Sequence, residues 1–208
     1  MSKKLLFTAA LFLIGGSLYA AVSGGKWANF VQRIVGAFGK NLTSLQQQSA
    51  LEIARAFDRY GDGDLRKLVY MLAVAWHESR LQPIREIRAA PGTAVYEIQK
   101  IYWHTGFFGR GYVQLSLRLN YEKMSRFLGI DLVSNPDLAL QPWYAAQIMV
   151  YGMMEGVFTG KKLSDYITPA KADYYNARRT VGSIMVAGTD TAALIEGHVK
   201  SIFKSLNT

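Results

Sequence analysis

The 208-residue chain contains no cysteine. This absence excludes a disulfide framework, a cysteine-ligated zinc site and a thiol nucleophile. Acidic residues are also few, since 15 Asp and Glu stand against 24 Lys and Arg, for a formal net charge of +9. A basic surface attracts polyanions such as nucleic acid, anionic lipid or acidic wall polymers, and charge alone does not choose among them.

Hydrophobic residues make up half of the chain, and 12% of its residues are aromatic. This composition supports a real core and argues against a disordered chain. The length fits one domain with a short addition, because domains usually hold about 100–200 residues.

Charge is absent from the run Leu5–Val22, which follows Lys3 and Lys4. An apolar run directly behind two lysines is typical of an export segment. We therefore expect residues 1–24 to be a signal peptide or an uncleaved signal anchor, the latter open to release from the inner membrane. Either alternative predicts an exported protein, periplasmic or anchored in the inner membrane and facing the periplasm.

Residues 25–43 follow as a connector with hydrophobic residues at helical spacing, among them Trp27, Phe30 and Ile34. Lys26 and Arg33 are interspersed. Two interpretations stay open: an interfacial helix lying on anionic lipid, or a helix packed against the domain.

Residues 44–208 form the predicted catalytic domain, which is mainly α. Helical periodicity is expected over residues 45–60, 65–79, 114–128, 142–156, 170–181 and 191–206. Residues 80–113 lack long periodicity and are rich in Gly and Pro, so they predict loops with at most a short hairpin. The helix over 65–79 is apolar nearly all round and should be central and buried.

Glu78 stands at the end of that buried helix, one turn beyond Val74. A carboxylate there is partly desolvated, which raises its pKa, as a general acid requires near neutral pH. The alternative is a structural glutamate at the edge of the core, paired with Arg80 or Arg85.

Glu86 provides a second carboxylate, flanked by Arg85 and Arg88. Nearby cations favour its ionised form, so the two glutamates have opposite environments, as in an acid/base pair. Glu97 is a rival for the role of base.

The segment 109–116, GRGYVQLS, has a glycine on either side of Arg110. Such glycines allow close approach of the backbone to a ligand or to another chain, but no phosphate-loop pattern is present. Ser116 and Asn120 are four residues apart, so on a helix they share a face and could hold a water or a sugar hydroxyl.

These motifs together resemble glycoside hydrolase family 19, which contains plant-type chitinases and phage endolysins. The resemblance covers roughly residues 45–205, and its motifs are HES at 77–79, PIRE at 83–86, GRGYVQLS at 109–116, LGIDLVSNPDLA at 128–139 and NARR at 176–179. The missing cysteines place the chain nearer to the phage-type lysozyme branch. Ser79 replaces the threonine that usually follows the His-Glu pair of the family.

The resemblance implies a lysozyme-like, two-lobed α+β fold with a central buried helix, a substrate cleft and at most a short β-hairpin. By the same likeness Glu78 is the general acid, Glu86 the general base, Ser116 a holder of the attacking water and Asn120 part of the sugar site. It further suggests Tyr102, Trp103, Tyr112 and Gln114 for the cleft, and Arg178 with Arg179 for orienting a carboxylate or lining the cleft. No metal and no cofactor is expected.

The leading functional hypothesis is an exported, inverting glycosidase that cleaves β-1,4 bonds between the N-acetylated amino sugars of peptidoglycan. A chitinase is the alternative enzyme, and a non-catalytic, membrane-tethered wall-binding protein is the alternative of another class. The expected partners are the polysaccharide and, through the N-terminal segment, the inner membrane. We expect a monomer that does not bind nucleic acid, because no nucleic-acid motif accompanies the charge.

Overall fold

The computed structural model describes residues 25–39 and 42–207. The predicted export segment, residues 1–24, lies outside this part of the chain. No helix within the described ranges is long and apolar enough to cross a membrane.

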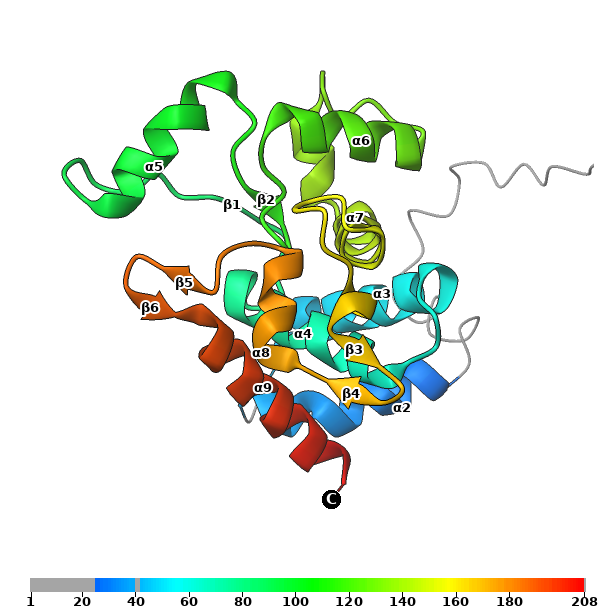
Figure 1. The fold of residues 1–208 in the computed structure, drawn as a ribbon. Coiled ribbons are helices and arrows are strands. Elements are labelled where there is room, and N and C mark those ends of the chain that lie inside the picture. The colour runs from blue at the N-terminus through cyan, green and yellow to red at the C-terminus, as the bar shows by residue number, and fades with distance from the viewer. Residues whose placement is uncertain (1–24, 40–41, 208) are drawn as a thin grey trace, which may run out of the picture.

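The helices lie in a lower and an upper lobe (Figure 1). The lower lobe contains α2 (Lys26–Ile34), α3 (Ser44–Tyr60), α4 (Leu65–Ser79), α8 (Tyr174–Ala177) and α9 (Thr191–Leu206), and the upper part contains α5 (Ala94–Tyr102), α6 (Arg118–Leu128) and α7 (Pro142–Glu155). Five 3-10 turns join them: η1 (Val35–Phe38), η2 (Trp103–Thr105), η3 (Pro136–Leu140), η4 (Leu163–Asp165) and η5 (Arg178–Thr180).

The described strands form three antiparallel pairs, and each strand has only two residues. The pairs are β1 (Ile84–Arg85) with β2 (Arg110–Gly111), β3 (Ile167–Thr168) with β4 (Lys171–Ala172), and β5 (Met185–Val186) with β6 (Thr189–Asp190). The mainly α fold is therefore confirmed, with more short strand pairs than the single hairpin expected.

Helix α4 is the centre of the core, as its all-round apolar pattern predicts. Its residues from Leu68 to Ala75 are all completely buried. The helix begins where the side chain of Asp64 accepts a hydrogen bond from the backbone N–H of Arg66. An aspartate in this position satisfies one of the free N–H groups of the first turn.

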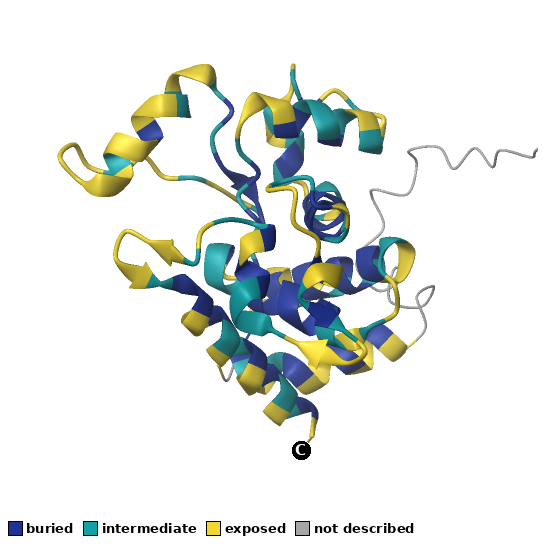
Figure 2. Ribbon diagram, in the orientation of Figure 1, coloured by how far each residue is buried: buried dark blue, intermediate teal, exposed yellow. Residues whose placement is uncertain are grey.

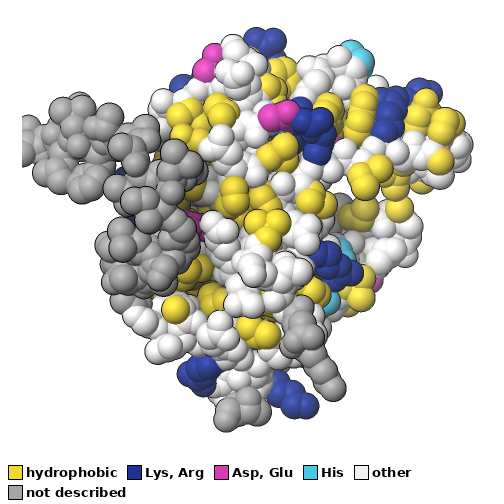
Figure 3. All heavy atoms as spheres, turned by 180° about the vertical axis from the view of Figure 1, so that it is seen from behind, with side chains coloured by type: hydrophobic (Ala, Val, Ile, Leu, Met, Phe, Trp, Pro, Cys, Tyr) yellow, Lys and Arg dark blue, Asp and Glu magenta, His cyan; other side chains and the backbone are white. Residues whose placement is uncertain are grey.

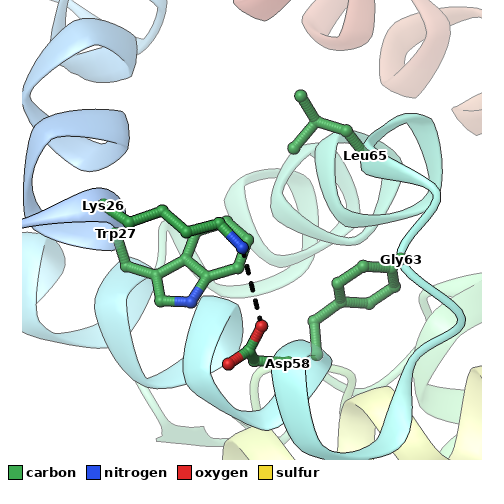
Figure 4. Close-up of a pocket in the computed structure, with 6 residues that line it drawn as sticks. Lys26, Trp27, Asp58, Gly63 and Leu65 are labelled. Carbon is green, nitrogen blue, oxygen red and sulfur yellow. Dashed lines mark ion pairs between the residues drawn. The ribbon is translucent and has the colours of Figure 1, made fainter. Parts of the chain in front are cut away.

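Helix α2 packs against the domain within the described part of residues 25–43. Trp27, Phe30, Val31 and Ile34 recur at helical spacing, and all four are buried. A small pocket lies between α2, the end of α3 and the start of α4, where the Lys26 ammonium is 3.7 Å from the Asp58 carboxylate (Figure 4). Neither Glu78 nor Glu86 lines this pocket.

Two helix predictions were wrong in part. The helix expected over 114–128 begins only at Arg118, because Gln114 and Leu117 have positive φ angles of 53° and 70°, outside the right-handed helical region. The helix expected over 170–181 is reduced to α8 and η5, since Lys171 and Ala172 pair as a strand instead.

Helix α5 forms within residues 80–113, where only loops and a hairpin were expected. Thr93 caps it by accepting a hydrogen bond from the backbone N–H of Tyr96. The helix is exposed along nearly its whole length, and Gln99 is its only buried residue (Figure 2). Viewed from behind, hydrophobic and basic side chains lie together over α5 (Figure 3).

Candidate active site

The chain reverses direction directly after Glu78. Arg80 and Leu81 both have left-handed backbone conformations, with φ angles of 53° and 55°. The backbone N–H of Leu81 donates to the carbonyl of Ala75, and the Gln46 side chain donates to the carbonyl of Arg80. This anchored turn leads the chain from the end of α4 into β1, which precedes Glu86.

Glu78 lies in a desolvated position at the end of α4, with 19% of its side chain exposed. Burial raises the pKa of its carboxyl, and the positive charge of Arg178 partly opposes the increase. The structure thus confirms the expected direction of the pKa shift. A carboxyl of raised pKa can hold a proton for donation near neutral pH.

Arg178 provides the ionic partner of Glu78. Its Nη1 lies 2.7 Å from Oε1 of Glu78, and only 8% of its side chain is exposed. The two atoms form an ion pair without a well-directed hydrogen bond, and Oε1 of Glu78 has no hydrogen-bond partner among the described residues. Nε of Arg178 donates to the carbonyl of Ser183 at 3.1 Å, which fixes the guanidinium. This contact matches the predicted role of Arg178 in orienting a carboxylate, whereas Arg179 is exposed.

Glu86 is held by three neutral donors. Its Oε1 accepts hydrogen bonds from the Tyr102 hydroxyl at 2.6 Å and from Nε2 of Gln99 at 2.9 Å. Its Oε2 accepts from the backbone N–H of Gly109 at 2.7 Å. Hydrogen bonds thus reach both oxygens of the carboxylate and fix its position.

The two arginines beside Glu86 in the sequence do not bind it. Arg85 pairs with Asp137, and Arg88 lies 5.1 Å and 5.0 Å from the ring centres of Tyr96 and Trp103. The expected environment of Glu86 was therefore wrong: neutral hydrogen-bond donors, and not the neighbouring arginines, bind the carboxylate.

Gly109 is enclosed by the site. A Cβ atom at this position would lie 2.7 Å from Oε1 of Gln114 and 3.1 Å from Oε2 of Glu86. The backbone reaches Glu86 this closely because the residue is glycine. Gln114 in turn donates to the carbonyls of Ile84 and Gly111, so it links β1 to β2 beside Glu86.

Arg110, between the two glycines, has a structural role. Its guanidinium donates to Asp137, to the hydroxyl of Tyr121 and to the carbonyls of Gly106 and Phe108. These bonds hold the loop before β2 against α6 and η3, and the charge of Arg110 is not directed at a ligand.

Ser116 and Asn120 are neighbours, but they do not share a helix face. Ser116 precedes α6, and its carbonyl accepts a hydrogen bond from the Asn120 amide at 3.0 Å. The Ser116 hydroxyl makes no hydrogen bond with any described residue in the structure, and its role in holding water stays a prediction.

The three predicted aromatic cleft residues lie in different environments. Tyr102 contacts Glu86 directly, and Trp103 stacks on Phe108 with 4.5 Å between ring centres. Tyr112 is completely buried, burial raises the pKa of its hydroxyl, and this hydroxyl has no hydrogen-bond partner among the described residues. The structure therefore places Tyr112 in the core and not on a surface that a sugar could reach.

The rival base and a missed residue are both on α5. Glu97 is exposed and pairs with Lys100 at 3.0 Å, away from the other candidates. Gln99 was not predicted, although it binds Glu86. Gln99 differs from the other residues of α5 in being buried, and the sequence alone does not indicate this burial. Across the described residues no three His, Asp or Glu side chains form a group that could hold a metal.

Comparison with known proteins gives a match to a family model. Residues 89–154 match the model of glycoside hydrolase family 19, described as chitinase class I. The resemblance to family 19 is confirmed. The matched segment contains Gln99, Gly109 and Ser116 but begins after Glu78 and Glu86, so the assignment of these two glutamates depends on their geometry.

Two solved structures of chitinase C have a similar fold. The enzyme from Streptomyces griseus HUT6037 has a TM-score of 0.53 and 21% identity over 93% of this chain and 77% of that chain. A chitinase C with glutamine in place of a glutamate has a TM-score of 0.53 and 20% identity, over 87% and 90%. No curated protein sequence matches the chain. The family 19 match supports a glycosidase, and the two structures support the fold.

Proposed function

We propose that the protein hydrolyses β-1,4 bonds between N-acetylated amino sugars of peptidoglycan, with Glu78 as general acid and Glu86 as general base. The observation that carries this proposal is the contrast between the two carboxyl groups. Glu78 is desolvated and its pKa is raised, whereas Glu86 receives three hydrogen bonds. Pairs of carboxyl groups in opposite environments divide the acid and base roles.

The reaction follows from these two environments. Protonated Glu78 donates its proton to the glycosidic oxygen as the bond from this oxygen to the anomeric carbon breaks. Glu86 removes a proton from a water whose oxygen bonds to the anomeric carbon from the opposite face. The configuration of this carbon is inverted, as expected where a water lies between the two carboxyl groups.

Peptidoglycan as the substrate is supported by the sequence. The chain carries a formal charge of +9, which suits an anionic cell wall, and its N-terminal run has the pattern of an export segment. The missing cysteines and the PIRE run at 83–86, close behind Glu78, also resemble the lytic branch of family 19. Export to the periplasm, by cleavage or by release of an anchor, belongs to the same proposal.

Chitin is the second candidate substrate, and a specific observation favours it. The matched family is described as chitinase class I, and both similar structures are chitinases. Both polymers present N-acetylglucosamine, so one site of this kind could act on either.

Digestion of purified peptidoglycan and of soluble chitin side by side, with mass spectrometry of the products, tests the proposal. We expect reducing-end muropeptides, and loss of activity in Glu78→Gln and Glu86→Gln. Release of chito-oligosaccharides alone would favour the chitinase. A 1,6-anhydro product would indicate a lytic transglycosylase and contradict hydrolysis. Normal wall binding by an inert wild-type protein would support the non-catalytic alternative.

A further inference from the structure

Helix α5 contacts Glu86 through two of its side chains. Its outer face exposes Val95, Ile98 and Ile101, and Ile101 is 75% exposed. The one buried side chain, Gln99, points inward, where its Oε1 accepts from the backbone N–H of Ala89 at 2.7 Å. A helix with so little apolar burial depends on directed polar contacts for its position.

Both side-chain donors from α5 converge on one oxygen of Glu86. Nε2 of Gln99 donates to Oε1 and also to the carbonyl of Ile87, each at 2.9 Å, and the hydroxyl of Tyr102 donates to the same Oε1 at 2.6 Å. The other oxygen, Oε2, receives one hydrogen bond, from the backbone N–H of Gly109.

The two oxygens of Glu86 are therefore not equivalent. A carboxylate oxygen has two lone pairs. Both lone pairs of Oε1 are matched by donors from α5, whereas Oε2 retains one that no described residue occupies. Oε2 also lies on the side of Gly109 that faces Oε1 of Gln114. Oε2 is thus the oxygen that is free to accept a proton.

A stack of rings and guanidinium groups holds α5 in this position. Arg88 lies between the rings of Tyr96 and Trp103, and Trp103 stacks on Phe108. Arg110 covers the same Phe108 ring at 4.1 Å. This stack holds α5 independently of Glu86. The loss of one hydrogen bond to Glu86 therefore need not displace α5.

We propose that Gln99 and Tyr102 are positioning residues that occupy Oε1 of Glu86 and leave Oε2 to take the proton of the attacking water. The proposal rests on the proposed function. It predicts that both residues affect the rate of the chemical step more than the binding of the polysaccharide, because neither would contact the sugar in this role.

The first test compares Tyr102→Phe with Tyr96→Phe, a tyrosine on the same helix that does not contact Glu86. Hydrogen bonds to charged groups are worth enough for a loss of about 10- to 100-fold in kcat when one is removed. We expect this loss for Tyr102→Phe with KM nearly unchanged, and wild-type kinetics for Tyr96→Phe. Equal kinetics in the two variants would overturn the proposal.

The second test uses pH, with Gln99→Glu and Gln99→Leu as a matched pair. The introduced acid repels Glu86 when ionised but donates a hydrogen bond to it when protonated. We therefore expect the activity of Gln99→Glu, relative to wild type, to recover as the pH falls, while that of Gln99→Leu stays low. Parallel profiles for both variants would contradict a positioning role and indicate a merely structural one.

Circular dichroism of each variant shows whether it folds. If the Gln99 variants do not fold, Tyr102→Phe still tests the proposal, because it retains all three hydrogen bonds of Gln99. A wild-type protein without activity on either polymer would overturn the proposed function together with this inference. An active wild type with unaffected Tyr102 and Gln99 variants would overturn the inference alone.

Discussion

Replacing Arg178 with methionine should move the alkaline limb of the rate profile to higher pH. Arg178 lowers the pKa of Glu78, while burial raises it by more. Methionine keeps much of the apolar stem of arginine but removes the charge, so only the raising effect is left. Because a general acid acts in its protonated form, a higher pKa extends activity into more alkaline solution.

The size of this change follows from the ion pair. Two unit charges about 4 Å apart interact by about 4 kcal/mol at an effective dielectric constant of about 20. At about 1.36 kcal/mol per pKa unit, this corresponds to at most about three units. Water reaches Glu78, whose side chain is 19% exposed, and screens part of the interaction. We therefore expect an upward displacement of about one to three pH units.

The assay is kcat/KM against pH on the best soluble substrate, with a carbon-13 NMR titration of the Glu78 carboxyl as an independent readout. Arg178→Lys retains the charge and loses the same hydrogen bond to Ser183, so its limb should stay near that of wild type. Arg179→Gln, at the exposed neighbour, is the control for the segment. An alkaline limb that stays fixed in Arg178→Met, or moves equally in Arg178→Lys, would refute the reasoning.

Three further predictions concern single residues. Glu86→Gln should lower kcat by about 100- to 10,000-fold with the fold intact, because a general base contributes that much, while Glu97→Gln stays near wild type in the same assay. Gly109→Ala should reduce kcat, since the new Cβ would lie 2.7 Å from Oε1 of Gln114; wild-type kinetics would show that the loop adjusts freely. Gly197→Ala in α9 should raise the free energy of unfolding by about 0.5–1 kcal/mol in urea titrations, because the site is open and helical; any loss of stability would contradict this.

The helices that the sequence predicts best are those whose ends are set by local capping. Residues 65–79 and 191–206 match α4 and α9 to the residue, and Asp64 and Asp190 cap their first turns. The first turn expected before Arg118 fails because Leu117 adopts a left-handed conformation that its residue type does not announce. The end of α4, which carries Glu78, was therefore predictable from the sequence, whereas the path of the loops around the site was not.

Helix α5 shows why the rest of the site could not be predicted. Its periodic hydrophobic residues, such as Ile98 and Ile101, point to solvent, and the side that faces the protein is marked by the polar Gln99. Hydrophobic periodicity identifies a helix by the face that it buries. When the contacts are instead hydrogen bonds to a carboxylate 13 residues earlier, no local pattern indicates them.

The arginines of the site illustrate the same limit more sharply. Successive residues of an extended chain point to opposite sides, so Arg85 in β1 is directed away from Glu86 and pairs with Asp137. The guanidinium that reaches a glutamate comes from Arg178, 100 residues beyond Glu78. Proximity in the sequence suggested a cation beside Glu86, whereas the structure has one beside Glu78. The environments of the two carboxyl groups nevertheless differ, as expected. Burial raises the pKa of the Glu78 carboxyl, and three neutral donors bind Glu86. The contrast between the two glutamates thus rests on solvation and hydrogen bonds, and not on the arginines that flank Glu86 in the sequence.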